Sequence, residues 1–262
     1  MTRIIHAELI RLLRWRTIVI AVIGSLLFSV VATLTVLSSA VTTGVQSRRG
    51  SATLAALTGN GGGTEAFAVG ASFVGFFVFV TFIALLASEF SGGTFRALLL
   101  RDPHRLRVIV GKLVGILMVA AAIVALAEVF TFALSLIVAP TKDISNANWF
   151  SLSSIGEAVR DYGTVFAGVV GWAVFGTTLA VIFRSAPLAL GVGFAWAGPF
   201  ENIVVDSWRA GYRFFPGQVL ASLIRGGTAE LGVGRAMFTA AVYCGLAAAA
   251  TLVLVSRRDV TA

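Results

Sequence analysis

The chain alternates between long apolar runs and short polar connections. Several of the runs reach the roughly 20 residues that an α-helix needs to cross the hydrocarbon core of a bilayer. The predicted spans are about 17–40, 66–87, 108–139, 163–183, 188–205 and 235–255. This pattern predicts an all-α membrane protein with six transmembrane helices, folded as a single transmembrane domain over residues 1–262.

Residues 1–16 precede the first span and have the pattern of an amphipathic helix. Four apolar residues share one face: Ile5, Leu9, Leu12 and Leu13. The arginines lie elsewhere around the helix, and Trp15 suits the headgroup level. We expect this segment to lie flat on the anionic inner leaflet of the membrane. The alternative is a flank that serves only to fix the topology.

The remaining connections differ in what they predict. Residues 41–65 contain a glycine cluster without the Lys-Ser/Thr of a phosphate-binding loop, which favours a flexible loop. Residues 140–162 predict an outer loop, with a short surface helix over 154–160. The Gly-Pro pair at 198–199 should break span five, because proline removes a backbone donor. Residues 206–234 are too polar to span.

The connection between spans two and three, residues 88–112, holds the densest pattern of the chain. Gly92-Gly93 can adopt the backbone conformations of a sharp turn. Thr94 then suits the N-cap of a short helix, because its hydroxyl can accept from an unpaired N–H. The apolar residues of this short helix share one face: Phe95, Leu98 and Leu99.

A second helix start follows within the same connection. Asp102 is a suitable N-cap and Pro103 a suitable first helical residue. Three basic residues then line the mouth of the third span: Arg105, Arg107 and Lys112. The pattern alone leaves two interpretations open, a basic loop that fixes topology and a surface that docks a partner.

Composition supports the membrane assignment, and the distribution of charge predicts the orientation of the protein in the membrane. The chain is 58% hydrophobic and only 12% charged, whereas soluble domains carry about 25% charged residues. Six spans place both termini on one side. That side holds twelve of the 20 basic residues: Arg3, Arg11, Arg14, Arg16, Arg96, Arg101, Arg105, Arg107, Lys112, Arg184, Arg257 and Arg258.

Only four of the 12 acidic residues lie there, so the whole net charge of +8 falls on this side. An excess of Lys and Arg marks the cytoplasmic face, so we expect both termini in the cytoplasm of a cell (plasma) membrane protein. The basic excess is then topogenic and faces anionic lipid, and no nucleic-acid partner is needed to explain it.

Candidate catalytic chemistry is sparse. Cys244 is the single cysteine, and His6 and His104 fall at the membrane surfaces, so we expect neither a disulfide nor a metal site. Glu128 is the one acid that periodicity puts well inside a span. It can be a proton relay or a substrate contact, but equally a structural hydrogen-bonding group or a residue at the outer interface. Glu201, just after the break in span five, is a second candidate for a translocation path.

The pattern E-F-x-G-G-T-x-R-x-L-L at 89–99, followed by D-P-x-R-x-R-V-x-x-G-K at 102–112, resembles the permease subunits of ABC-2 type transporters. The resemblance implies an interfacial elbow helix at the N-terminus, a cytoplasmic coupling helix between spans two and three, and short re-entrant helices before span six. The residues that it implies for coupling to an ATPase are Glu89, Gly93, Thr94, Phe95, Arg96, Leu98, Leu99, Asp102, Arg105 and Lys112.

The function expected from this resemblance is that of a permease subunit exporting a hydrophobic or amphipathic compound. The chain has no G-x-x-x-x-G-K-[ST] run, so ATP and Mg²⁺ should bind to a separate cytosolic ABC ATPase, and this chain should bind no cofactor. The resemblance also implies a second permease copy, in a homodimer or heterodimer. The alternative is a proton-coupled secondary transporter that uses Glu128. An intramembrane enzyme is disfavoured, since the spans lack paired His and carboxylate residues.

Overall fold

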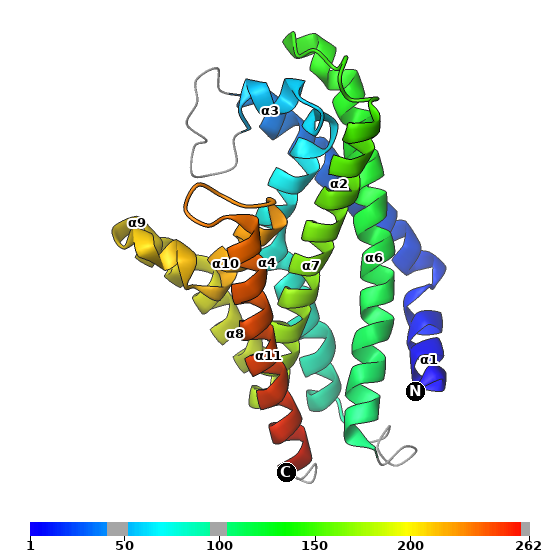
Figure 1. Ribbon diagram of the computed structural model, residues 1–262. Coiled ribbons are helices and arrows are strands. Elements are labelled where there is room, and N and C mark those ends of the chain that lie inside the picture. Colours follow the sequence, from blue (N-terminus) through cyan, green and yellow to red (C-terminus); the bar gives the residue numbers. More distant parts are fainter. Residues whose placement is uncertain (41–51, 95–103, 258–262) are drawn as a thin grey trace.

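The computed structural model of the chain describes residues 1–40, 52–94 and 104–257 (Figure 1). Within these residues, six helical segments are long and apolar enough to cross a membrane. Both termini lie at the same end of the bundle in Figure 1, as an even number of spans requires. The protein is therefore an all-α, multi-pass membrane protein, as the apolar pattern predicts.

The helices follow one another in a simple order. They are α1 (Thr2–Leu12), α2 (Trp15–Ser38), α3 (Leu54–Thr58), α4 (Gly62–Ser91), α6 (Arg105–Val138), η1 (Ala139–Lys142), α7 (Leu152–Phe183), α8 (Ala186–Ala195), η2 (Trp196–Phe200), α9 (Glu201–Ser207), η3 (Arg209–Arg213), α10 (Pro216–Ile224) and α11 (Val233–Arg257).

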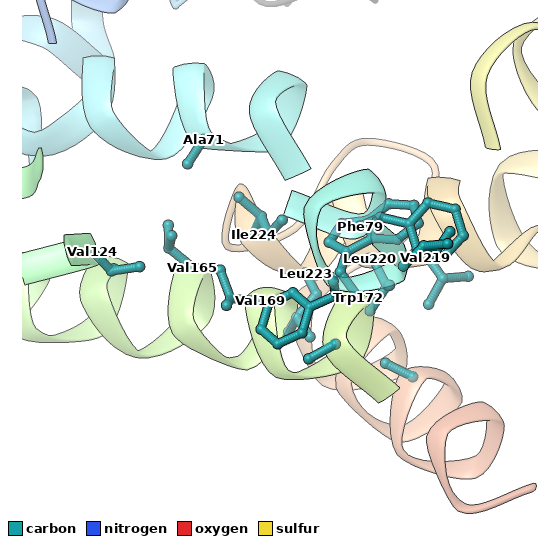
Figure 2. Packing of buried hydrophobic residues seen from close by; sticks show 14 of the residues in the cluster. Ala71, Phe79, Val124, Val165, Val169, Trp172, Val219, Leu220, Leu223 and Ile224 are labelled. Carbon is teal, nitrogen blue, oxygen red and sulfur yellow. The ribbon is translucent and has the colours of Figure 1, made fainter. Parts of the chain in front are cut away.

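The centre of the bundle is formed by α4 and α7, with α10 packed against both (Figure 2). Glycines of α7 permit this close approach. A Cβ added at Gly168 would lie 2.2 Å from Ile224, and one at Gly171 would lie 2.4 Å from Leu220. Because these positions carry no side chain, the short helix α10 can bury its apolar face inside the bundle.

The first predicted helix, residues 1–16, is divided in the structure. α1 ends at Leu12, and Arg14 has an extended backbone with φ −70° and ψ 145°. Trp15 then begins α2, so it belongs to the first span and not to the amphipathic helix. The extended residue lets the chain turn from α1 into α2, which an unbroken helix could not do.

The fourth span begins earlier than predicted, and the expected outer loop over 140–162 is largely helical. α7 starts at Leu152, where the side chain of Ser151 accepts a hydrogen bond from the backbone N–H of Ser154 at 3.2 Å. Asp161 does not end the helix, because its carboxylate accepts a 2.6 Å hydrogen bond from the hydroxyl of Thr64. Because its carboxylate has a hydrogen-bond donor, Asp161 can lie inside the helix.

The glycine cluster of the 41–65 connection is packed, contrary to the flexible loop expected from its composition. α3 lies within this connection and α4 begins at Gly62. A Cβ at Gly62 would meet the carbonyl oxygen of Leu57 at 1.8 Å and the indole nitrogen of Trp149 at 2.6 Å. Glycine is needed here for space, since Trp149 donates a 2.8 Å hydrogen bond to the same Leu57 carbonyl.

The break predicted at residues 198–199 takes the form of one wide turn. The π-helical turn η2 contains Pro199 and links α8 to α9, so span five continues to Ser207. A π-turn accommodates the backbone acceptor that proline leaves without its donor. The polar segment 206–234 folds into the short helices η3 and α10 before α11 begins.

Hydroxyl groups join α2 to α6 in the half of the bundle remote from the termini. The Ser29 hydroxyl donates to the carbonyl of Ala127 at 3.1 Å, and the Thr131 hydroxyl donates to Ser29 Oγ at 3.0 Å. Ser29 and Thr131 are fully buried. These bonds fix where along α6 the first span makes contact.

Candidate functional site

Four charged side chains from three helices meet at the end of the bundle that holds both termini. Glu8 and Arg11 come from α1, Glu89 from the last turns of α4, and Lys112 from the second turn of α6. We call these four residues the ion network. Glu89 and Lys112 stand on either side of the connection between α4 and α6 that sequence analysis singled out.

Lys112 lies at the centre of the ion network. Its Nζ is 2.7 Å from Glu89 Oε1 and 3.0 Å from Glu8 Oε2. Arg11 completes a ring of contacts, with Nη1 2.7 Å from Glu89 Oε1 and Nη2 2.6 Å from Glu8 Oε1. Two carboxylates thus face two cations, and the network is formally neutral.

The central members of the ion network are buried. Glu8, Glu89 and Lys112 are 4%, 7% and 5% exposed. Each charge would cost several kcal/mol to remove from water alone, and the opposite charges offset that cost only while every partner stays in place. The network therefore does little to raise total stability, but it specifies one relative position for α1, α4 and α6.

Two glycines let α1 approach α6 closely enough to form the ion network. A Cβ at Gly111 would lie 3.0 Å from Ile4, and one at Gly115 would lie 3.0 Å from Glu8 Cβ. Both distances are tighter than ordinary van der Waals contact. The Gly-Lys pair at 111–112 thus combines a close backbone approach with the central cation.

The turn after α4 has the backbone that its sequence predicts. Gly92 is the C-cap of α4, and Gly93 has a positive φ of 71°, which favours glycine. Thr94 is already helical and its hydroxyl donates to the carbonyl of Glu89 at 3.2 Å, so it closes the end of α4 and is not the non-helical N-cap predicted from the sequence. Thr94 is the last residue before a stretch that the structure does not describe.

Several of the residues implied in coupling fall outside the described part of the chain. They are Phe95, Arg96, Leu98, Leu99 and Asp102. α6 begins at Arg105 with His104 as N-cap, two residues after the start predicted at Pro103. The side chain of Arg105 is also outside the described set. The structure thus brings Glu89 and Lys112 together, with Gly93 and Thr94 at the adjacent turn.

Glu8 and Arg11 were not among the residues that sequence analysis assigned to this site. A signal for them exists in the sequence. Glu8 is the first acidic residue of the chain, and the next is Glu65. Arg11 follows Glu8 by three residues, a spacing that lets the two side chains pair on one helix face, but only the packing of α1 on α6 adds Lys112.

Glu128 belongs to a second polar group, farther along the spans. It lies on α6, is half-buried, and interacts electrostatically with Asp161 of α7. Its Oε1 is buried without a hydrogen-bond partner among the described residues. Asp161 interacts in turn with Glu65 of α4. Three carboxylates from three spans therefore share one region of the bundle.

Arg225, at the end of α10, is the basic neighbour of this region. Burial lowers the pKa of its guanidinium, and the nearby carboxylates of Glu65 and Glu230 act in the opposite direction. Among the described residues no group of three or more His, Cys, Asp or Glu side chains is arranged to hold a metal ion.

Glu201 has no exposed surface, and its carboxylate is used within the fold. Its two oxygens accept hydrogen bonds from the backbone N–H groups of Gly217 and Gln218, each at 3.2 Å. These donors lie in the first turn of α10, where a helix has unpaired N–H groups and attracts negative charge. The contacts favour a structural role for Glu201 over the translocation path suggested by its sequence position.

The apolar helices define the class as a multi-pass, all-α membrane protein with a buried ion network at one end. More particularly, the chain belongs to the family described as protein of unknown function (DUF2705), whose profile matches residues 17–261. No curated protein matches the chain.

Proposed function

We propose that this chain is the transmembrane permease subunit of an ATP-driven ABC transporter that exports a hydrophobic or amphipathic compound. A separate cytosolic ATPase would bind ATP and Mg²⁺ and would dock on residues 95–103. A second permease copy would complete the translocation path. The protein would lie in the plasma membrane with both termini in the cytoplasm.

The observation that carries the proposal is the double contact of Lys112. Its ammonium lies 2.7 Å from Glu89 at the end of α4 and 3.0 Å from Glu8 on α1. The segment resembling a coupling helix connects α4, which ends two residues after Glu89, to α6, which begins seven residues before Lys112. A partner that moved this segment would therefore move α4, α6 and α1 together.

Such a mechanism needs a stiff connection between the docking segment and the spans. The ion network supplies stiffness, because separating any of its buried charges leaves an uncompensated ion. Movement of the segment would then tilt the two spans as a body and change access to a path between two permease copies. In this mechanism the chain contributes the docking segment and part of the translocation path, and the partner ATPase contributes the free energy of ATP hydrolysis.

The proposed orientation is supported by charge and by the placement of the termini. Both termini and the ion network lie at one end of the bundle, the end assigned twelve of the 20 Lys and Arg residues. Positive residues flank the cytoplasmic ends of spans. This end would therefore meet a cytosolic ATPase.

The experiment is affinity purification of the full chain from its native membrane, followed by identification of a P-loop ATPase and measurement of its ATP hydrolysis. We expect Leu99→Asp to abolish co-purification. Leu152→Asp is the matched control, because Leu152 is an 86% exposed leucine at the first residue of α7, at the opposite end of the bundle. Retention of the ATPase by both variants would contradict the proposed docking segment.

A second candidate function is proton-coupled transport, favoured by the carboxylate of Glu128. Its buried, unpartnered Oε1 and its neighbour Asp161 are features of a residue that can exchange a proton. Glu128→Gln should then abolish transport driven by a pH gradient in vesicles without any ATPase. The permease proposal instead predicts that transport requires the ATPase and survives this substitution in part.

A further inference from the structure

A groove lies between α6 and the corner formed by α1 and α2. Its volume is about 400 Å³, within the roughly 300–1,000 Å³ typical of ligand sites. The lining is apolar except for the hydroxyl of Thr17. Residues from all three helices contribute, among them Leu9, Leu13, Ala21, Met118, Ala122 and Leu126.

The groove exists because α6 meets its neighbours at two separate levels. α1 contacts α6 at Gly111 and Gly115, and α2 contacts α6 through the hydrogen bond of Ser29 to Ala127. The groove lies along the stretch of α6 between these two contacts. The lining residues of α6 run from Met118 to Leu126, and at about 1.5 Å per helical residue this stretch extends for roughly 12 Å. Part of an extended acyl chain can fill this length.

Two arginines lie where α1 turns into α2, beside the groove. Leu13 and Thr17 line the groove, and between them the chain carries Arg14, Trp15 and Arg16, all exposed. Trp15 is 77% exposed and suits the headgroup level of a bilayer. An apolar groove with two exposed arginines at the adjacent corner matches a molecule that has an acyl tail and a negatively charged head.

We propose that this groove binds one acyl chain of an anionic phospholipid from the surrounding leaflet, with the phosphate of its headgroup held by Arg14 and Arg16. A peptide segment fits the groove less well, because an apolar lining cannot pair the peptide's backbone N–H and C=O groups. The site would hold α1 against α6 next to the contact of Glu8 with Gly115. It does not depend on the proposed transport function.

The test is native mass spectrometry of the full chain purified in detergent and exposed to phosphatidylglycerol or phosphatidylcholine with identical acyl chains. We expect one phosphatidylglycerol to remain bound in preference to phosphatidylcholine. Ala122→Trp fills the groove and should lower retention about tenfold, the loss for roughly two methylenes excluded from apolar contact. Ala249→Trp, at an exposed alanine of α11, is the matched control and should bind normally.

The headgroup contact has its own variant pair. Arg14→Gln with Arg16→Gln should remove the preference for phosphatidylglycerol, whereas Arg235→Gln, at an exposed arginine of α11, should preserve it. Should Ala122→Trp not fold, as judged by its thermal unfolding midpoint, Ala21→Phe fills the groove from α2 and gives the same readout.

Two outcomes would overturn the proposal. Equal lipid retention by the groove-filling variant and its α11 control would mean that the lipid binds elsewhere. Conversion of a dimer to a monomer by Ala122→Trp, without any change in lipid retention per chain, would mean that a second copy of the chain covers the groove.

Discussion

The ammonium of Lys112 lies 2.7 Å from the carboxylate of Glu89, across 23 residues of sequence. This pair joins the end of α4 to the beginning of α6, and the contact of the same ammonium with Glu8 adds α1. The relative position of three helices thus depends on one buried cation.

Removing the central cation should destabilise the protein strongly. In Lys112→Met, Glu8 and Glu89 keep only the half-exposed Arg11, and breaking a buried ion network typically costs about 3–5 kcal/mol. The measurement is the free energy of unfolding in mixed micelles of increasing denaturing detergent. Lys142→Met removes an exposed lysine and should change stability by less than about 0.5 kcal/mol. Equal losses in the two variants would mean that the network carries no buried charge.

Separating α1 from α6 should release the N-terminal helix without unfolding the bundle. Gly115→Leu places a side chain where Glu8 Cβ lies 3.0 Å from the glycine's Cβ position, and such overpacking costs about 1–3 kcal/mol. Hydrogen exchange should then accelerate in α1 and stay unchanged in α7. Gly245→Leu is the control, because its Cβ position has no atom within 4 Å. Slow exchange in α1 of the first variant would argue against close packing.

Adding a methyl group at Gly217 should disrupt the contact between Glu201 and α10. A Cβ at Gly217 would lie 2.4 Å from Glu201 Oε2, so Gly217→Ala must displace the carboxylate and should cost about 1–3 kcal/mol. Limited proteolysis between α9 and α10 reports the loosened segment. Gly234→Ala, in α11, meets nothing within 4 Å and should resist the protease like the parent protein. Identical digestion of the two variants would contradict the contact.

The two ends of the bundle should face opposite sides of the membrane. In a Cys244→Ala background, Ser153→Cys at the start of α7 should react with an impermeant maleimide in intact cells. Ser91→Cys at the end of α4 should react only after permeabilisation, as the basic excess at its end predicts. Both serines are exposed. The reverse pattern would place the ion network outside the cell and remove any role for a cytosolic partner.

Hydropathy predicted the number of spans because it reports which segments can enter lipid. It does not report where a helix ends. The fourth span, α7, begins at Leu152 and not near 163. Ser151 caps its first turn, and the hydroxyl of Thr64 donates a hydrogen bond to the carboxylate of Asp161. Likewise, composition predicts a loop for the glycines at the start of α4, whereas glycine occurs there because neighbouring atoms leave no space for a side chain. Gly62 lies against Leu57 and Trp149, which composition cannot reveal.

The same distinction explains the ion network. Glu89 and Lys112 belong to one local pattern, so sequence analysis placed both at the site. Glu8 and Arg11 join them only because α1 packs on two glycines of α6. Arg11 and Glu89 are 78 positions apart in the sequence, so no local pattern connects them. Residues 95–103 lie outside the described part, so the implied coupling roles of Phe95, Leu98 and Leu99 stay predictions.

The carboxylate of Glu201 belongs to the fifth span, yet the N–H groups that it binds begin the helix leading into the sixth. A shift of the fifth span would therefore drag α10, which is wedged between α4 and α7. The last two spans and the bundle centre are thereby tied into one mechanical unit. A displacement of α4 at its Glu89 end would therefore reach spans five and six as well as α1 and α6.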